Sequence, residues 1–311
     1  MSDPIDRHLE RVYRRLNPAR LGSGGAGELT PDDLSLGAPG DRTDLMFQTY
    51  SERGILRALK AYGTLERIER RLGASLRLRL ELEDPYTPRL IATLPDHPDP
   101  AIDITLSQRT GSSLGLEGAG AGLRLLFLES IVLQRPGEPF TWERPPLPHQ
   151  AHPGLSLSGE ILQLLLLMQR RLATDAFGLI PKSAVSAAIF ARFFRFVDPE
   201  AQRRLGAFRA LSREAPLWYT AWAAELGCVR NHRGEVLTFQ PSLMLSPLTP
   251  RARALIAPRR RRLPWSPSRP RPTIDQHCLR ERFPWERMPE GPVPARVQQL
   301  VGERPASTPG R

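Results

Sequence analysis

The sequence predicts an α/β fold with a mixed, mostly antiparallel sheet flanked by helices, and with irregular N- and C-terminal tails. Apolar residues recur at intervals of three or four over residues 54–73, which is typical of an amphipathic helix that ends at Gly73. Leu alternates with charged residues over 75–84, as in a half-exposed strand. Residues 123–134 are apolar on both faces, as in a central strand covered on both sides.

The remaining elements follow from shorter patterns. We expect short antiparallel strands at 89–94 and 101–106, a helix over about 155–173, a strand around 177–181, helices at 183–196, from Asp198 onward and at 214–227, and a hairpin within 228–248. The interpretation divides the chain into a flexible N-terminal arm (1–45), one α/β domain (46–250) and a disordered tail (251–311).

The positive charge is concentrated in that tail. The chain carries a net charge of +11, and residues 251–311 hold 14 Arg and 11 Pro against five acidic residues. Such a composition buries too little apolar surface to fold, so deletion of 257–311 should leave the melting of the core unchanged. A flexible Arg-rich tail binds polyanions non-specifically through counterion release, and no motif for specific nucleic-acid recognition is present.

Several classes of protein are disfavoured. The N-terminus lacks the apolar segment of a signal peptide, and no apolar run approaches the roughly 18 residues of a membrane span, so no membrane partner is expected. Cys228 and Cys278 are too few for a disulfide framework or a zinc site, which favours a reducing, cytoplasmic location. His149 and His152 lack a third ligand, so no metal is expected.

The stretch "HPGLSLSGEIL", from His152 to Leu162, places a Gly/Ser-rich loop directly before the most apolar helix. Two interpretations are open. The free N–H groups of the first helical turn can hold an anion, which Gly and Ser allow to approach the backbone closely. Alternatively, Ser158 is an ordinary helix N-cap.

The order of elements over residues 54–248, together with this loop, resembles the GNAT superfamily of acyl-CoA-dependent N-acyltransferases. The resemblance implies that acetyl-CoA or another acyl-CoA is a substrate and that an amine of a small molecule or protein is the acceptor. It also implies that the loop binds the coenzyme pyrophosphate, through Gly154, Leu155, Ser156, Leu157, Ser158 and Gly159. Many family members use a Tyr on the later helix to protonate the leaving thiolate, where this chain has Phe190, Phe193 and Phe194.

Glu129 interrupts the apolar strand 123–134. A buried carboxylate there would have a raised pKa suited to a general base, and family members often carry such a Glu. The competing interpretation pairs Glu129 with an Arg from a covering helix. The alternative function is a non-catalytic acyltransferase-like module that binds a partner through the Pro-rich segment 134–151 and the tails.

Overall fold

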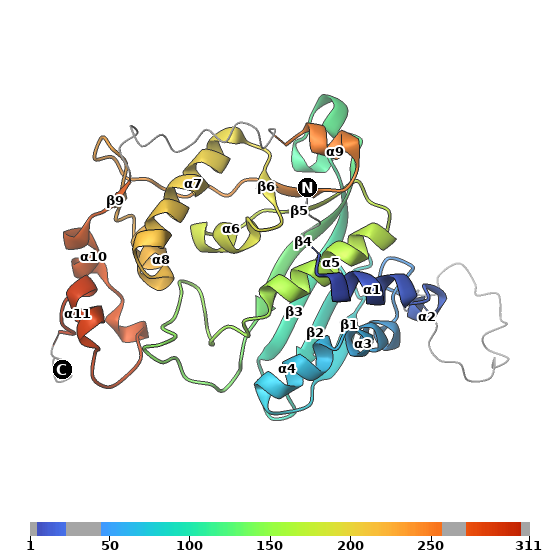
Figure 1. Cartoon of the computed structure of the whole chain (residues 1–311), viewed down its shortest axis with the longest axis horizontal. Helices are drawn as coiled ribbons and strands as arrows, with labels where there is room; N and C mark the ends of the chain where they lie inside the picture. The colour runs from blue at the N-terminus through green and yellow to red at the C-terminus, as the bar shows by residue number, and fades with distance from the viewer. Residues whose placement is uncertain (1–4, 23–44, 257–271, 306–311) are drawn as a thin grey trace. The chain divides into compact units, whose positions relative to one another are not determined.

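The computed structural model describes residues 5–22, 45–256 and 272–305, and it confirms the α/β class (Figure 1). The chain divides into two compact units. Unit 1 contains Met1–Pro136, Leu155–Leu179 and Pro247–Arg253, and unit 2 contains Gly137–Gly154, Ile180–Ser246 and Ala254–Arg311. The predicted α/β domain (46–250) therefore contains parts of both units, and the chain passes from one unit to the other several times.

Unit 1 is a sheet with helices packed on it. Its elements are α1 (Arg7–Arg15), α2 (Ala19–Gly22), α3 (Glu52–Ala61), α4 (Thr64–Leu72), β1 (Arg77–Glu81), β2 (Arg89–Thr93), β3 (Pro100–Thr110), β4 (Arg124–Leu133), α5 (Ser158–Arg171), β5 (Ala176–Leu179) and α9 (Pro250–Ala254). The strands lie in the order β1-β2-β3-β4-β5. The first three pairings are antiparallel and β4 pairs with β5 in parallel, so the sheet is mixed as expected.

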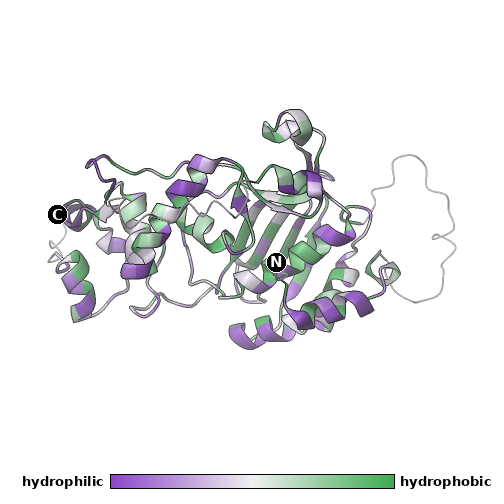
Figure 2. Ribbon diagram, turned by 45° about the horizontal axis from the view of Figure 1, so that its top comes forward, coloured by the Kyte–Doolittle hydropathy of each residue, from purple (hydrophilic) through white to green (hydrophobic). Residues whose placement is uncertain are grey.

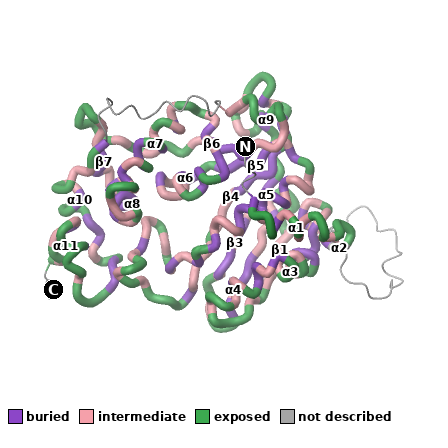
Figure 3. The backbone as a smooth tube through the Cα atoms, in the orientation of Figure 1, coloured by how far each residue is buried: buried purple, intermediate pink, exposed green. Residues whose placement is uncertain are grey.

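The alternation of side chains fixes the register of the sheet. Leu78 lies opposite Ala92, and Ala92 lies opposite Ile102, so these apolar side chains share one face. The other face carries charged residues such as Arg89 and Asp103, and Figure 2 shows the resulting stripes along the strands. Leu125–Leu128 of β4 are buried, in keeping with the predicted central strand (Figure 3).

The helix expected over 54–73 is two helices. The chain breaks at Gly63, whose φ of 67° is left-handed, so α3 ends before it and α4 begins after it. Gly73 ends α4 as predicted, with a φ of 69°. An apolar period of three to four residues continues across such a break, and therefore the periodicity alone did not reveal it.

The N-terminal arm is folded where the structure describes it, which corrects the expectation of a flexible segment. Asp6 caps α1 by accepting the His8 N–H at 2.7 Å, and Leu9 is buried. Glu10 pairs with Arg170 of α5 at 2.8 Å. The apolar face of α1 packs against α5. The amino-acid composition of residues 1–45 does not predict this contact.

Unit 2 is built from helices around a core that contains several aromatic side chains. Its elements are α6 (Ala184–Phe190), β6 (Arg195–Phe196), α7 (Pro199–Glu214), α8 (Leu217–Glu225), β7 (Val229–Arg230), β8 (Met244–Pro247), β9 (Thr273–Ile274), α10 (Gln276–Arg282) and α11 (Ala295–Val301). Asp198 caps α7 with Pro199 in its first turn, as predicted. The hairpin expected within 228–248 is largely replaced, because β7 pairs with β9 and β8 pairs with β6.

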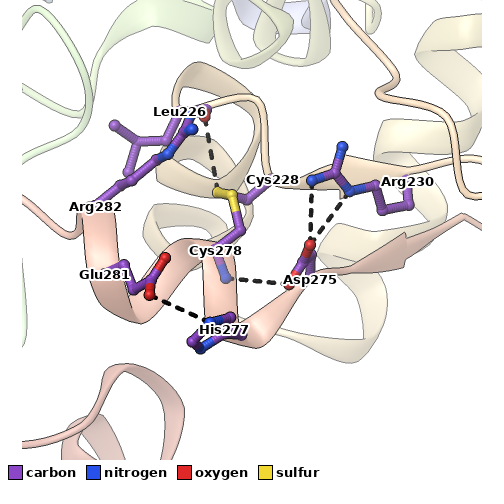
Figure 4. Close-up of a disulfide and its surroundings, with 8 residues drawn as sticks. All are labelled: Leu226, Cys228, Arg230, Asp275, His277, Cys278, Glu281 and Arg282. Carbon is purple, nitrogen blue, oxygen red and sulfur yellow. Dashed lines mark hydrogen bonds and ion pairs between the residues drawn. A yellow bond between two sulfur atoms is a disulfide. The ribbon is translucent and has the colours of Figure 1, made fainter.

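The two cysteines form a disulfide, which the sequence did not lead us to expect (Figure 4). Pairing of β7 with β9 brings the Cα atoms of Cys228 and Cys278 to 5.6 Å. Asp275 caps α10 by accepting the Cys278 N–H at 3.0 Å and pairs with Arg230 at 3.1 Å, and these contacts lower the pKa of Asp275. Disulfides are typical of oxidising compartments, so the cysteines give no reason to expect a reducing cytoplasm.

Much of the predicted C-terminal tail is also folded. Leu279, Phe283, Met288, Val297 and Val301 are buried in the core of unit 2, and Cys278 is tied to Cys228. Removal of 257–311 would therefore remove part of this core, contrary to the predicted neutral deletion. The Arg- and Pro-rich stretch 257–271 and residues 306–311 lie outside the described residues.

Candidate functional site

The loop before α5 places its residues alternately inward and outward. Leu155 and Leu157 are buried, and the Leu155 N–H donates to the Leu133 carbonyl at 3.1 Å, which ties the loop to the end of β4. Ser156 is exposed, with a left-handed φ of 58°. Of the six predicted coenzyme-binding residues, Leu155 and Leu157 are buried and anchor the loop. Ser156 is exposed, and the other three are half-buried: Gly154, Ser158 and Gly159.

The start of α5 has donors without acceptors. The residue at the N-cap is Leu157, with no side-chain capping bond, so Ser158 is not the cap that the ordinary interpretation requires. The N–H groups of Glu160 and Ile161 reach the Leu157 carbonyl at 3.0 Å. Within the part of the chain that the structure describes, the N–H groups of Ser158 and Gly159 have no acceptor. They point to where an anion can bind.

Two arginines of α4, which the sequence reading did not single out, flank this turn. Arg71 donates to the carbonyls of Leu155 and Ser156, both at 2.8 Å, and places its charge beside the loop. Arg67 pairs with Glu160 at 2.5 Å, an interaction that raises the pKa of Arg67. Glu160 is the acidic residue of the first turn, and its pairing lowers its repulsion of an anion. The four-residue spacing of these arginines on one helix is the signal that could have found them.

Glu129 is not a buried, unpaired carboxylate. It is 26% exposed, accepts from the Ser107 hydroxyl at 2.5 Å and pairs with Arg109 at 2.7 Å. Its partner is an arginine of β3, the neighbouring strand, and not of a covering helix. A register shift leaves Glu129 opposite no residue, since Thr105 faces Ser130 and Leu106 faces Leu128. Such a bulge re-aims a side chain.

The loop and Glu129 are separated along β4. The loop joins the strand at Leu133, and a strand rises about 3.3 Å per residue, so Glu129 lies roughly 13 Å further along. An extended ligand is needed to reach both, and acyl-CoA is extended.

The other candidate residues have structural partners. His149 pairs with Glu225 at 3.0 Å. Phe190, Phe193 and Phe194 are buried and place no hydroxyl at a site. Within residues 5–22, 45–256 and 272–305, no group of three or more His, Cys, Asp or Glu side chains is placed to hold a metal ion.

Comparisons with known proteins give no family to compare with this site. No family model and no curated protein matches the chain. Among the described residues, no helix has both the length and the apolar character needed to cross a membrane.

Proposed function

We propose that the chain is an acyl-CoA-dependent N-acyltransferase, with the coenzyme pyrophosphate at the first turn of α5. The observation that carries this proposal is that the N–H groups of Ser158 and Gly159 have no hydrogen-bond acceptor among the described residues and lie beside the guanidinium of Arg71. The connection of a central strand through this loop to α5, and then to a parallel strand, supports the same location.

The N-terminus of α5 and the guanidinium of Arg71 both attract an anion. The N-terminus of α5 carries about half a positive charge, and the Ser156 and Ser158 hydroxyls add donors. Arg71 adds a full charge, while its bonds to two loop carbonyls hold the loop in place.

In the proposed reaction, the acceptor nitrogen attacks the thioester carbonyl and the carbon–sulfur bond breaks. The coenzyme A thiolate leaves and takes up a proton from water. The proton of the attacking amine passes to Glu129, directly or through a water molecule. The acceptor is an amine of a small molecule or of a protein.

Arg71→Gln tests the anion site. We expect the dissociation constant for coenzyme A to rise about three- to tenfold, because one guanidinium charge near the pyrophosphate is lost. The matched control is Arg70→Gln, the same change at an exposed neighbour on α4, which should alter the constant less than twofold. Equal weakening in both variants, measured by titration calorimetry at fixed salt, would indicate non-specific attraction and contradict the site.

Glu129→Gln tests the proposed base. Turnover should fall on the order of a hundredfold while coenzyme affinity stays within twofold, since a general base acts on the reacting proton and not on the pyrophosphate. Asp103→Asn is the control, because Asp103 is also paired with an arginine, Arg89, at 2.6 Å. If the wild-type protein binds coenzyme A but transfers no acyl group, the non-catalytic module replaces the enzyme as the better account.

A further inference from the structure

Unit 1 contains a partly open apolar cavity that the sequence did not predict. Its volume is about 100 Å³, and it lies between α5, the helices α1 and α3, and the apolar face of the sheet. Leu164 and Met168 of α5 and Ile102 and Ile104 of β3 are among its lining residues. In Figure 1, α1 and α5 lie side by side over the strands.

One part of this cavity is polar. Arg171 lines it, together with Tyr13, Tyr50 and Tyr62. The guanidinium lies 4.7 Å from the centre of the Tyr13 ring and donates to the Tyr13 carbonyl at 3.3 Å. In the described chain, Arg171 has no carboxylate partner within ion-pairing distance, although a half-buried arginine usually has one.

Two buried phenols add donors. Tyr50 and Tyr62 are 5% and 7% exposed, and both line the cavity together with Arg171. Burial raises the pKa of Tyr62 to about 12 and that of Tyr50 further, so both phenols stay protonated and can donate. A guanidinium and two protonated phenols that line the same apolar cavity form a set of hydrogen-bond donors suited to an anionic acceptor.

We propose that this cavity binds a short-chain aliphatic carboxylate, with its carboxylate on Arg171, Tyr50 and Tyr62 and its alkyl tail among the aliphatic side chains. Guanidinium groups bind carboxylates through paired, charge-assisted hydrogen bonds. The site is separate from the proposed coenzyme site, because Arg171 ends α5 whereas Ser158 begins it, roughly 20 Å away along a 14-residue helix.

The cavity volume limits the ligand. A cavity of about 150 Å³ accommodates the six carbons of benzene, so this one accommodates roughly four carbons. Butanoate fits without rearrangement, and longer chains such as hexanoate must extend through the opening.

Calorimetric titration of the intact protein with acetate, butanoate and hexanoate tests the ligand class. Affinity should rise about fourfold for each methylene buried. Hexan-1-ol should bind at least tenfold more weakly than hexanoate, and hexylammonium should not compete. If acetate binds as well as hexanoate, or hexan-1-ol as well as hexanoate, the proposal is wrong.

Variants locate the binding. Arg171→Gln should weaken hexanoate at least tenfold, whereas Arg170→Gln, at the neighbouring arginine that pairs with Glu10, should change it less than threefold. Ala58→Leu fills the cavity and should abolish binding, whereas Ala61→Leu, at an exposed position of α3, should not. If Arg171→Gln fails to fold, Tyr62→Phe and Ala58→Leu decide the matter.

The same variants separate this proposal from the proposed function. Ala58→Leu should leave coenzyme A affinity unchanged, and Arg71→Gln should leave hexanoate affinity unchanged. Hexanoate binding that survives Ala58→Leu and Tyr62→Phe would overturn the cavity as its site, whatever the result with coenzyme A.

Discussion

Reduction of the Cys228–Cys278 disulfide should lower the free energy of unfolding of unit 2 by about 4 kcal/mol. The bond closes a loop between residues 50 positions apart, and the chain-entropy relation for a loop of that length gives about this value at 25 °C. Cys228 is fully buried in the core of unit 2, and Cys278 lies on α10, so the bond joins α10 to the rest of that core.

Urea unfolding with and without reductant measures this effect. The Cys228→Ala/Cys278→Ala double variant is the control. Its free energy of unfolding should be as low as that of the reduced protein and should not change with reductant. The transition that reports on unit 1 should not move, since both cysteines belong to unit 2. A loss below 1 kcal/mol would show that the C-terminal segment keeps its place without the bond.

Gly54→Ala should destabilise unit 1 by about 3 kcal/mol, at the upper end of the cost of overpacking. A Cβ on Gly54 would lie 1.8 Å from the carbonyl oxygen of Leu21 and 2.6 Å from its carbonyl carbon. These are backbone atoms, so no side chain can move aside. The same carbonyl accepts the N–H of Ser51 at 2.9 Å and its hydroxyl at 3.1 Å, and displacement of α2 would break both bonds.

The control for Gly54→Ala is Gly206→Ala in α7. A Cβ there meets no atom within 4 Å, so this helical glycine should gain up to about 1 kcal/mol on substitution. The two substitutions add the same methyl group and should have opposite signs in urea unfolding. If Gly54→Ala is neutral, α2 does not pack against α3 as described.

The sheet of unit 1 was the part most readable from sequence. Alternation over Leu76–Leu82 and the apolar run 123–134 are local patterns, and they correspond to β1 and β4. The bulge at Glu129 depends on how β4 pairs with a strand some twenty residues earlier, so no local pattern marks it. Its arginine partner was expected, but the strand that carries this arginine was not.

The sequence did not predict the folded C-terminal segment, because amino-acid composition does not show which individual residues make buried contacts. Prolines and arginines dominate residues 251–311, yet Leu279, Phe283 and Val301 are buried, and one disulfide offsets part of the entropy of ordering the segment. Two cysteines 50 residues apart carry no sequence signal that they are paired.

The sequence predicted the location of the candidate coenzyme site but not all of its residues. The loop before α5 was identified from its glycine and serines, whereas Arg67 and Arg71 were not, because their approach to it depends on how α4 packs in the fold. The cavity beside Arg171 is formed by elements from distant parts of the sequence and has no linear motif.

The most direct test of the proposed function is a titration of the intact protein with coenzyme A and acetyl-CoA, followed by thermal unfolding. A ligand present at a hundred times its dissociation constant stabilises the native state by about 2.7 kcal/mol. We expect saturable binding at one site and a rise in the unfolding midpoint, both reduced in Arg71→Gln and retained in Arg70→Gln. The absence of binding by the wild-type protein at millimolar concentrations of either ligand would contradict the account.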